Sequence, residues 1–183
     1  DIPTSLQIGD GTVIREYVTV HKSGFENGVT KVGDGCLLMA YSHVGHDCEI
    51  GNEVVVVNST ALSGHVIVED KAFISGLVGV HQFVRIGRNA MVGGMARVNQ
   101  DILPFSTVEG NPARLYSANA VGLKRANFKP NVRVAIKKAL NAIAQPELNT
   151  KQAVEKITVE IEIFDEIQYL IDFIENSSRG VTK

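Results

Sequence analysis

The sequence predicts a mainly β fold, a parallel β-helix built from six-residue repeats, followed by a small α-helical domain. Three observations predict it. An aliphatic residue recurs at every sixth position from Val32 to Val98, the fifth residue of each repeat is small or β-branched, and the apolar spacing becomes helical after Pro130. We expect the β-helix over residues 1–110 and the helical domain over residues 111–183.

The six-residue repeat defines which side chains point inward. Read in sixes from Val32, all twelve first positions are Val, Leu or Ile. The fifth positions are Cys36, Ser42, Cys48, Val54, Thr60, Val66, Ala72, Val78, Val84, Ala90, Ala96 and Ile102. Two inward residues suit a short strand followed by a turn at a residue that tolerates unusual φ, and three units close a triangular coil. The pattern resembles that of the left-handed parallel β-helix. The segment SGFENGV interrupts the repeat as an expected projecting loop.

Helical signals follow the segment EGNPARL. Pro130 can begin a helix that ends before Pro146, with Val132, Ile136, Leu140 and Ile143 on one face. A second helix is expected from Asn149 or Thr150. A third is expected to carry Ile163, Phe164, Ile167, Leu170, Ile171 and Ile174.

The composition, with 44% hydrophobic residues and a formal net charge of -2, is that of a globular protein. No apolar run approaches the ~20 residues of a spanning helix, and no signal peptide is visible. We therefore expect a cytoplasmic protein without an integral membrane segment. Two cysteines argue against a disulfide framework. The slightly acidic chain has no recognised nucleic-acid motif, so no nucleic-acid partner is expected.

Charge is unevenly distributed in the helical part. The chain has no acid between Asn111 and Gln145, and its basic residues there are Arg114, Lys124, Arg125, Lys129, Arg133, Lys137 and Lys138; acids dominate from Glu147 to Glu175. This basic run has two interpretations. It is either a solvated face that pairs with the acidic helices, or a docking surface for phosphates or an acidic protein.

The segment YSHVGHDCEIG places four reactive side chains, His43, His46, Asp47 and Cys48, within six residues. It suggests a metal site, a catalytic cysteine with its base, or a histidine base without either. Cys36 and Cys48 occupy the small inward position, so both are expected in the core, which weakens the cysteine interpretation.

Residues eighteen apart should stack on successive coils about 4.8 Å apart. His46, Gly64 and Gln82 then form one column, and His65 lies one coil along from Asp47. A histidine base needs an orienting partner and a substrate proton within reach, and Asp47 is adjacent. The glycine of the column permits a backbone N–H to approach a developing oxyanion.

The metal interpretation uses the same histidines differently. His43 and His46, with His65 or His81 of a neighbouring chain, would supply imidazole ligands, as in the zinc-dependent γ-class carbonic anhydrases. A plain surface role for each histidine also stays open.

Several strings carry a more specific resemblance: TVHKSG, TKVGDGCLLMAYSHVGHDC, LSGHVIVEDKAFISG, VHQFVRIGRNAMVGG, EGNPARL, GLKRANF and SSRGV. They resemble the acyl-carrier-protein-dependent UDP-N-acetylglucosamine O-acyltransferases that begin lipid A synthesis, over essentially the whole chain. Family members carry further N-terminal coils, so the chain looks like a C-terminal portion or a shortened member.

The resemblance implies a role for each site residue. The general base is His46, with Asp47 as its neighbour and Gly64 as the oxyanion donor. The implied substrate-binding residues are His43, His65, His81, Gln82, Asn119 and Arg125, of which the last two hold the uridine diphosphate end, and Gly94 limits acyl length. Val121 replaces an expected acid and Ala126 an expected second arginine, which weakens the expectation of nucleotide binding.

The implied reaction moves a (3-hydroxy)fatty acyl group from acyl carrier protein to the 3-hydroxyl of UDP-N-acetylglucosamine in a homotrimer, with neither metal nor cofactor. Three alternatives remain. They are a sibling acyltransferase acting on a 3-amino or other nucleotide sugar, a γ-class zinc hydro-lyase and a non-catalytic β-helical module.

Overall fold

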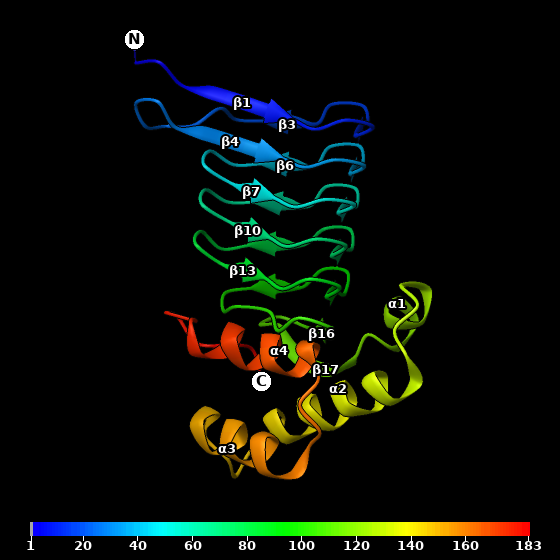
Figure 1. Ribbon diagram of the computed structural model, residues 1–183. Coiled ribbons are helices and arrows are strands. Elements are labelled where there is room, and N and C mark those ends of the chain that lie inside the picture. The colour runs from blue at the N-terminus through cyan, green and yellow to red at the C-terminus, as the bar shows by residue number, and fades with distance from the viewer. Residues whose placement is uncertain (1) are drawn as a thin grey trace.

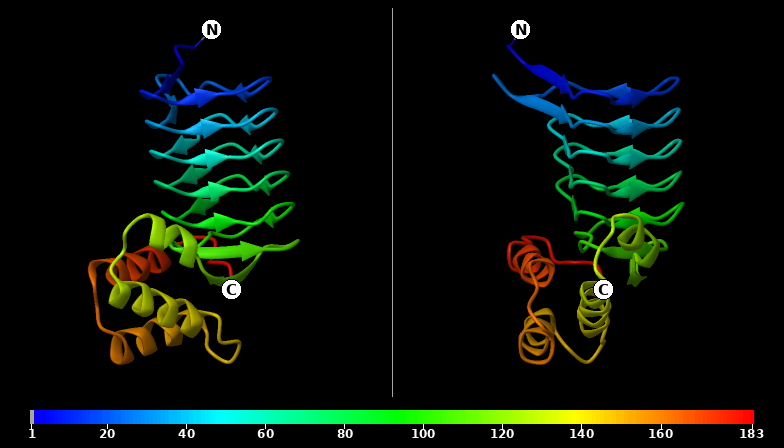
Figure 2. Two further views of the ribbon diagram at one scale, coloured as in Figure 1. Left: turned by 90° about the vertical axis from the view of Figure 1, so that its right-hand side faces the viewer. Right: turned by 45° about the vertical axis from the view of Figure 1, so that its right-hand side comes forward.

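The computed structural model describes residues 2–183. They form a tall parallel β-helix with helices gathered at its C-terminal end, as Figures 1 and 2 show. The predicted mainly β solenoid followed by helices is confirmed. No helix within residues 2–183 combines the length and the apolar character that crossing a membrane requires.

Three sheets form the walls of the β-helix. The first contains β1 (Ser5–Ile8), β4 (Val29–Val32), β7 (Glu49–Ile50), β10 (Ile67–Val68) and β13 (Arg85–Ile86). The second contains β2 (Val13–Ile14), β5 (Leu37–Leu38), β8 (Val55–Val56), β11 (Phe73–Ile74), β14 (Met91–Val92), β16 (Ser106–Glu109) and β17 (Arg114–Ala118). The third contains β3 (Thr19–Val20), β6 (His43–Val44), β9 (Ala61–Leu62), β12 (Gly79–Val80) and β15 (Arg97–Val98).

The coils pair in the expected register. Val44 pairs with Leu62 and Leu62 with Val80, so each coil advances by eighteen residues. The segment SGFENGV raises the step to twenty-four between Val20 and Val44. This segment therefore projects from the coil, as predicted, and leaves the stacking above and below it intact.

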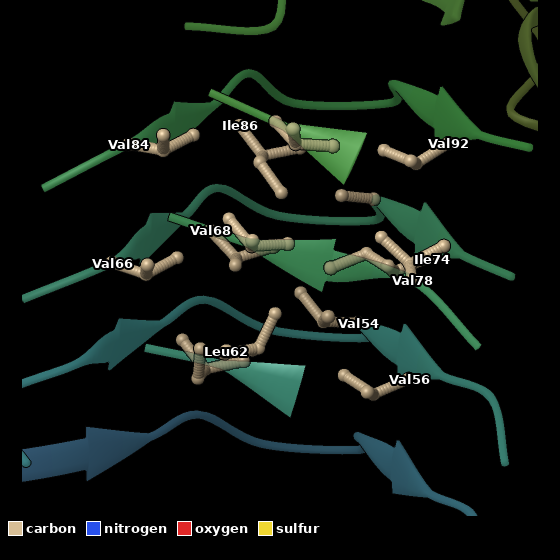
Figure 3. Close-up of a cluster of buried hydrophobic side chains, with 14 of the residues drawn as sticks. Val54, Val56, Leu62, Val66, Val68, Ile74, Val78, Val84, Ile86 and Val92 are labelled. Carbon is tan, nitrogen blue, oxygen red and sulfur yellow. The ribbon is translucent and has the colours of Figure 1, made fainter. Parts of the chain in front are cut away.

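The core of the β-helix consists of the first and fifth positions of the repeat, and Figure 3 shows their interdigitated side chains. Every such residue from Val32 to Ile102 is at most 3% exposed. Burial of each Val, Leu or Ile side chain contributes about 1.5–3 kcal/mol, so the repeated pair stabilises every coil in the same way.

The turns fall at the fourth position of the repeat. Asp47, His65 and Phe83 have φ of 60°, 61° and 64°, in the left-handed region. The glycines at the second position serve close stacking instead. A Cβ on Gly45 would lie 2.7 Å from the backbone nitrogen of Gly64 on the next coil.

The second sheet continues beyond the repeat. Strand β17 pairs antiparallel with β16 and carries the sheet to Ala118. The domain boundary between residues 110 and 111 stays a prediction, because this hairpin links the β-helix directly to the helices.

Four helices follow: α1 (Ala120–Arg125), α2 (Pro130–Ile143), α3 (Thr150–Glu160) and α4 (Asp165–Glu175). The predicted beginnings of α2 at Pro130 and of α3 after Asn149 are confirmed, the latter with a capping box to Gln152. The third prediction was wrong at its N-terminus, because Ile163 and Phe164 precede α4. The short helix α1 was not predicted.

Aromatic and cationic side chains attach α4 to the first sheet. The Arg88 guanidinium lies 3.9 Å from the Tyr169 ring centroid and 5.2 Å from that of Phe105, and Arg85 lies 4.2 Å from that of Phe173. The Tyr169 hydroxyl donates a hydrogen bond to Glu69. Cation–π contacts of this kind hold the last helix beside the coils.

Candidate functional site

His46 lies at the corner between β6 of the third sheet and β7 of the first. Its Nδ1 is 2.7 Å from Oδ2 of Asp47. An ionised carboxylate can only accept, so Nδ1 carries the proton and the Nε2 lone pair is free. The imidazole is 49% exposed. The side chain can therefore accept a proton from a bound molecule.

Besides His46, two groups of the projecting loop donate hydrogen bonds to the Asp47 carboxylate. The Ser23 hydroxyl donates to Oδ1, and the Gly24 N–H donates to Oδ2 over 3.1 Å. Burial by itself would raise the pKa of Asp47, but hydrogen bonds from Ser23, His46 and Gly24 outweigh it and lower the pKa. The carboxylate is thus kept ionised beside the imidazole.

Gly64 stacks one coil from His46, as predicted. A Cβ on Gly64 would lie 2.6 Å from Nε2 and 2.7 Å from Cε1 of the imidazole. Only a residue without a side chain permits this approach. Among residues 2–183, no hydrogen-bond acceptor is found for the Gly64 N–H. A free N–H donor thus lies beside the candidate base.

His65 completes the cluster. Its ring stacks on Phe83 at 4.6 Å between centroids and meets the His46 ring edge-on at 5.1 Å. Its Nε2 is 4.0 Å from Oδ2 of Asp47. The Phe25 ring from the projecting loop lies 5.7 Å from the His65 ring, between centroids. Aromatic packing therefore fixes His65 next to His46.

His43 has different partners. Its Nδ1 is 2.7 Å from the Thr19 hydroxyl, and its ring lies 4.7 Å from that of His21. Burial, with a smaller contribution from His21, lowers the pKa of His43. The lowered pKa favours the neutral imidazole at this position in the third sheet.

The residues that could together hold a metal ion differ from those that the sequence suggested. Within residues 2–183, the potential ligand atoms that lie within 4.8 Å of one another belong to His46, Asp47 and His65. The pair proposed from the spacing, His43 with His46, is not part of one cluster, and His81 is also outside it. The three-residue spacing therefore does not produce a shared site in one chain.

His81 and Gln82 lie two coils from His46 along the same corner. The Arg179 guanidinium donates to the Gln82 carbonyl and lies 3.4 Å from Nδ1 of His81. This arginine belongs to the C-terminal segment, whose Gly180 carbonyl accepts from the Asp101 N–H at 3.0 Å. The C-terminal tail thus brings a positive charge to the predicted site.

The cysteines are in the core, as expected. Cys36 and Cys48 are 1% and 0% exposed. Burial raises the pKa of Cys36 and raises that of Cys48 to about 11. Since the thiolate is the nucleophile, both thiols are unreactive near neutral pH.

Asn119 and Arg125 lie elsewhere. Asn119 caps α1 through a 3.0 Å bond from the Gly122 N–H, and its amide donates to the Asn89 carbonyl at 2.9 Å. Both line a cavity of about 500 Å³, together with Glu53, Lys71, Phe73, Asn89, Met91, Val121, Gly122 and Ala126. This cavity adjoins the second sheet, so one chain does not bring it to the His46 corner.

Gly94 is also separated from His46. It lies between β14 and β15, where the strands of the third sheet begin, whereas His46 follows β6, where they end. A Cβ on Gly94 would meet its nearest atom, the Gly76 carbonyl oxygen, at 3.5 Å, so a side chain fits there. A path between the two residues would cross the third sheet.

Sequence reasoning missed Ser23, Gly24 and Arg179. Ser23 precedes Asp47 by twenty-four residues instead of eighteen, because the projecting loop lies between their coils. Arg179 comes from the non-repetitive tail. The motif SSRGV was visible, but no periodicity connected it with the histidine column.

Two family models match the chain. The second domain of UDP-N-acetylglucosamine O-acyltransferase matches residues 101–182, and the bacterial transferase hexapeptide model matches residues 30–64. An acyl-carrier-protein-dependent UDP-N-acetylglucosamine O-acyltransferase from Gloeothece citriformis is 48% identical, over 96% of this chain and 63% of the relative. One from Alkalilimnicola ehrlichii is 41% identical, over 99% of this chain and 70% of the relative.

Solved structures agree with these matches. The UDP-N-acetylglucosamine acyltransferase of Francisella novicida has a TM-score of 0.90 and 34% identity, over 98% of this chain and 66% of that one. The Bacteroides fragilis enzyme has a TM-score of 0.90 and 30% identity, over 98% and 82%. The chain spans 63% and 55% of the length of two curated relatives. The chain belongs to the family of acyl-carrier-protein-dependent UDP-N-acetylglucosamine O-acyltransferases.

Proposed function

We propose that this chain carries the catalytic centre of an acyltransferase that moves a (3-hydroxy)fatty acyl group from acyl carrier protein to the 3-hydroxyl of UDP-N-acetylglucosamine. The observation that carries the proposal is the contact of His46 with both Asp47 and Gly64. It supplies an oriented base and a free N–H donor side by side. The reaction belongs in the cytoplasm, as the first step of lipid A synthesis.

In the proposed mechanism, Nε2 of His46 takes the proton of the acceptor hydroxyl as its oxygen attacks the thioester carbonyl. Asp47 stabilises the imidazolium that forms. The Gly64 N–H donates to the oxyanion of the tetrahedral intermediate. The intermediate expels the carrier's thiolate, which receives the proton back from His46. The ester product and the carrier thiol leave, and the enzyme returns to its starting state.

The separation of the two halves of the site supports a homotrimer. His46 lies between the third and first sheets, whereas Asn119 and Arg125 adjoin the second sheet. A neighbouring copy would bring its own cavity against the His46 corner. In this arrangement the sugar end reaches His46 of one chain while the nucleotide end contacts Asn119 and Arg125 of another. His43, His65, His81 and Gln82 line the path between them.

The basic run is proposed to receive the acidic carrier protein. Arg133 and Lys137 line a groove of about 440 Å³ with Ser117, Ala118, Ala120, Leu123, Pro130 and Val134. Within the described residues, no ion pair joins the basic run to an acid. These charges therefore remain available to a partner, which favours docking over pairing with the acidic helices.

Reversing Lys137 and Lys138 to Glu should raise the apparent KM for the acylated carrier at least several-fold. Raising salt should do likewise for the unchanged chain, because exposed charges are screened over about 8–10 Å. KM for UDP-N-acetylglucosamine should stay constant and serves as the control. An unchanged KM for the carrier in both experiments would show that the basic run is a solvated face and not a docking surface.

Replacing Gly94 by methionine should shift donor preference toward shorter acyl chains. The residue lies between two and three coils from His46, about 13 Å along the axis. It also lies at the opposite end of the third-sheet strands, so a path across that sheet suits a medium or long chain. A bulky side chain would fill the far end of that path. We expect kcat/KM to fall for long donors and to persist for short ones. A uniform fall for all donor lengths would show that Gly94 does not limit acyl length.

The proposed function is tested by assaying this chain with UDP-N-acetylglucosamine and carriers bearing 3-hydroxyacyl groups of several lengths. Ester formation at the 3-position is expected. The 3-amino nucleotide sugar, assayed in parallel, distinguishes the sibling activity. Chelator-sensitive carbon dioxide hydration would instead identify a metal-dependent hydro-lyase, and folded protein that binds neither substrate would identify a non-catalytic module.

A further inference from the structure

The projecting loop at residues 23–28 is exposed at its tip, but its first two residues contact the carboxylate beside the candidate base. Ser23 is 4% exposed, and its hydroxyl donates to Oδ1 of Asp47. The next residue, Gly24, donates its N–H to Oδ2. The loop therefore covers both oxygens of the carboxylate that orients His46.

Contacts within the loop set the direction of the Ser23 hydroxyl. Its oxygen accepts the Phe25 N–H at 3.1 Å. Its one proton then points to Asp47, since the other acceptor near it within residues 2–183, the Phe25 carbonyl oxygen, is 3.5 Å away. A Cβ on Gly28 would lie 2.1 Å from Ser23 Oγ, so the glycine is needed for the loop to close under the serine.

Strand β1 holds the loop in place. The Ser23 N–H donates to the Ser5 carbonyl at 3.2 Å, and the Ser5 N–H donates to the Gly28 carbonyl at 3.1 Å. The Asn27 N–H donates to the Pro3 carbonyl at 2.7 Å. These backbone bonds attach both ends of the loop to a strand, so the hydroxyl is presented from a fixed support.

We propose that Ser23 is a positioning residue for the acyl transfer: its hydroxyl fixes the Asp47 carboxylate, and the fixed carboxylate holds His46 with Nε2 free to take the acceptor's proton. The proposal rests on the proposed function. Without Ser23, the carboxylate loses one anchor and can rotate about its Cβ–Cγ bond. The imidazole then loses part of its orientation and of its preference for a proton on Nδ1.

The test is kinetic and uses the full chain. Ser23→Ala should lower kcat by about 10-fold to 100-fold, the range expected for a lost hydrogen bond to a charged group. KM for both substrates should stay within about two-fold, because Ser23 acts through Asp47. Ser5→Ala is the matched control, since its hydroxyl bonds to the Gly28 carbonyl at 3.3 Å and touches neither Asp47 nor His46.

A double-mutant cycle separates positioning from a structural role. If Ser23 acts through Asp47, adding Ser23→Ala to Asp47→Asn should change kcat by less than about two-fold. Independent, multiplicative losses would overturn the proposal, as would full activity of a folded Ser23→Ala variant. Thermal unfolding of each variant confirms that folded protein is compared.

A spectroscopic measurement keeps the inference distinct from the proposed function. The imidazole ¹⁵N NMR signals of His46 report which ring nitrogen carries the proton, and no substrate is needed. Ser23→Ala should raise the fraction protonated on Nε2, whereas Ser5→Ala should not. An unchanged tautomer would overturn the proposal. If the tautomer shifts but the unchanged chain does not transfer acyl groups, only the proposed function fails.

Discussion

Replacing His46 by alanine should reduce turnover by about 100-fold or more, the usual effect of losing a positioned base. Nδ1 of the imidazole is bonded to Asp47, and its Nε2 lies against Gly64. Its side chain is half-exposed and outside the core, so folding should be nearly unchanged. The measurement is kcat with saturating carrier and nucleotide sugar, alongside the melting temperature.

A second substitution separates base chemistry from packing. His46→Gln retains a polar side chain that can still donate to Asp47, but it has no nitrogen able to take a proton. It should be as inactive as the alanine variant. Near-normal turnover by either variant would show that His46 is not the general base.

Gly64→Ala should lower kcat by about 100-fold, because misplacing a reacting group by about 1 Å costs this much. The new Cβ would lie 2.6 Å from Nε2 of His46, and the imidazole must swing away. The movable group is the end of a half-exposed side chain, so the melting temperature should change little. The expected result is therefore a large loss of activity without a loss of stability.

The same substitution in a His46→Ala background provides the control. Alanine at position 64 keeps its N–H, so its effect on the displaced imidazole should disappear once the imidazole is absent. We expect the double variant to be nearly as active as His46→Ala alone. A further large loss would show that Gly64 acts independently of His46, for example by altering the oxyanion donor.

The repeat made most of the β-helix predictable. Val32 and Cys36 set a pattern that recurs without a break to Ile102, and each position is buried as expected. The proximity of His46 to Gly64 was predictable for the same reason, since one coil equals eighteen residues. The burial of both cysteines was predictable from their position in the repeat. The beginning of α4 was less predictable, because Ile163 and Phe164 are apolar but lie in the connection before the helix.

The contacts that complete the candidate site depend on the three-dimensional structure. Ser23 meets Asp47 because the inserted loop lengthens the step between their coils from eighteen to twenty-four residues, and Arg179 reaches Gln82 because the tail returns to the β-helix. A periodic chain encodes its neighbours in a constant spacing, so its contacts follow from counting. Irregular loops and tails have no such spacing, and only their packing against the coils decides which side chains meet.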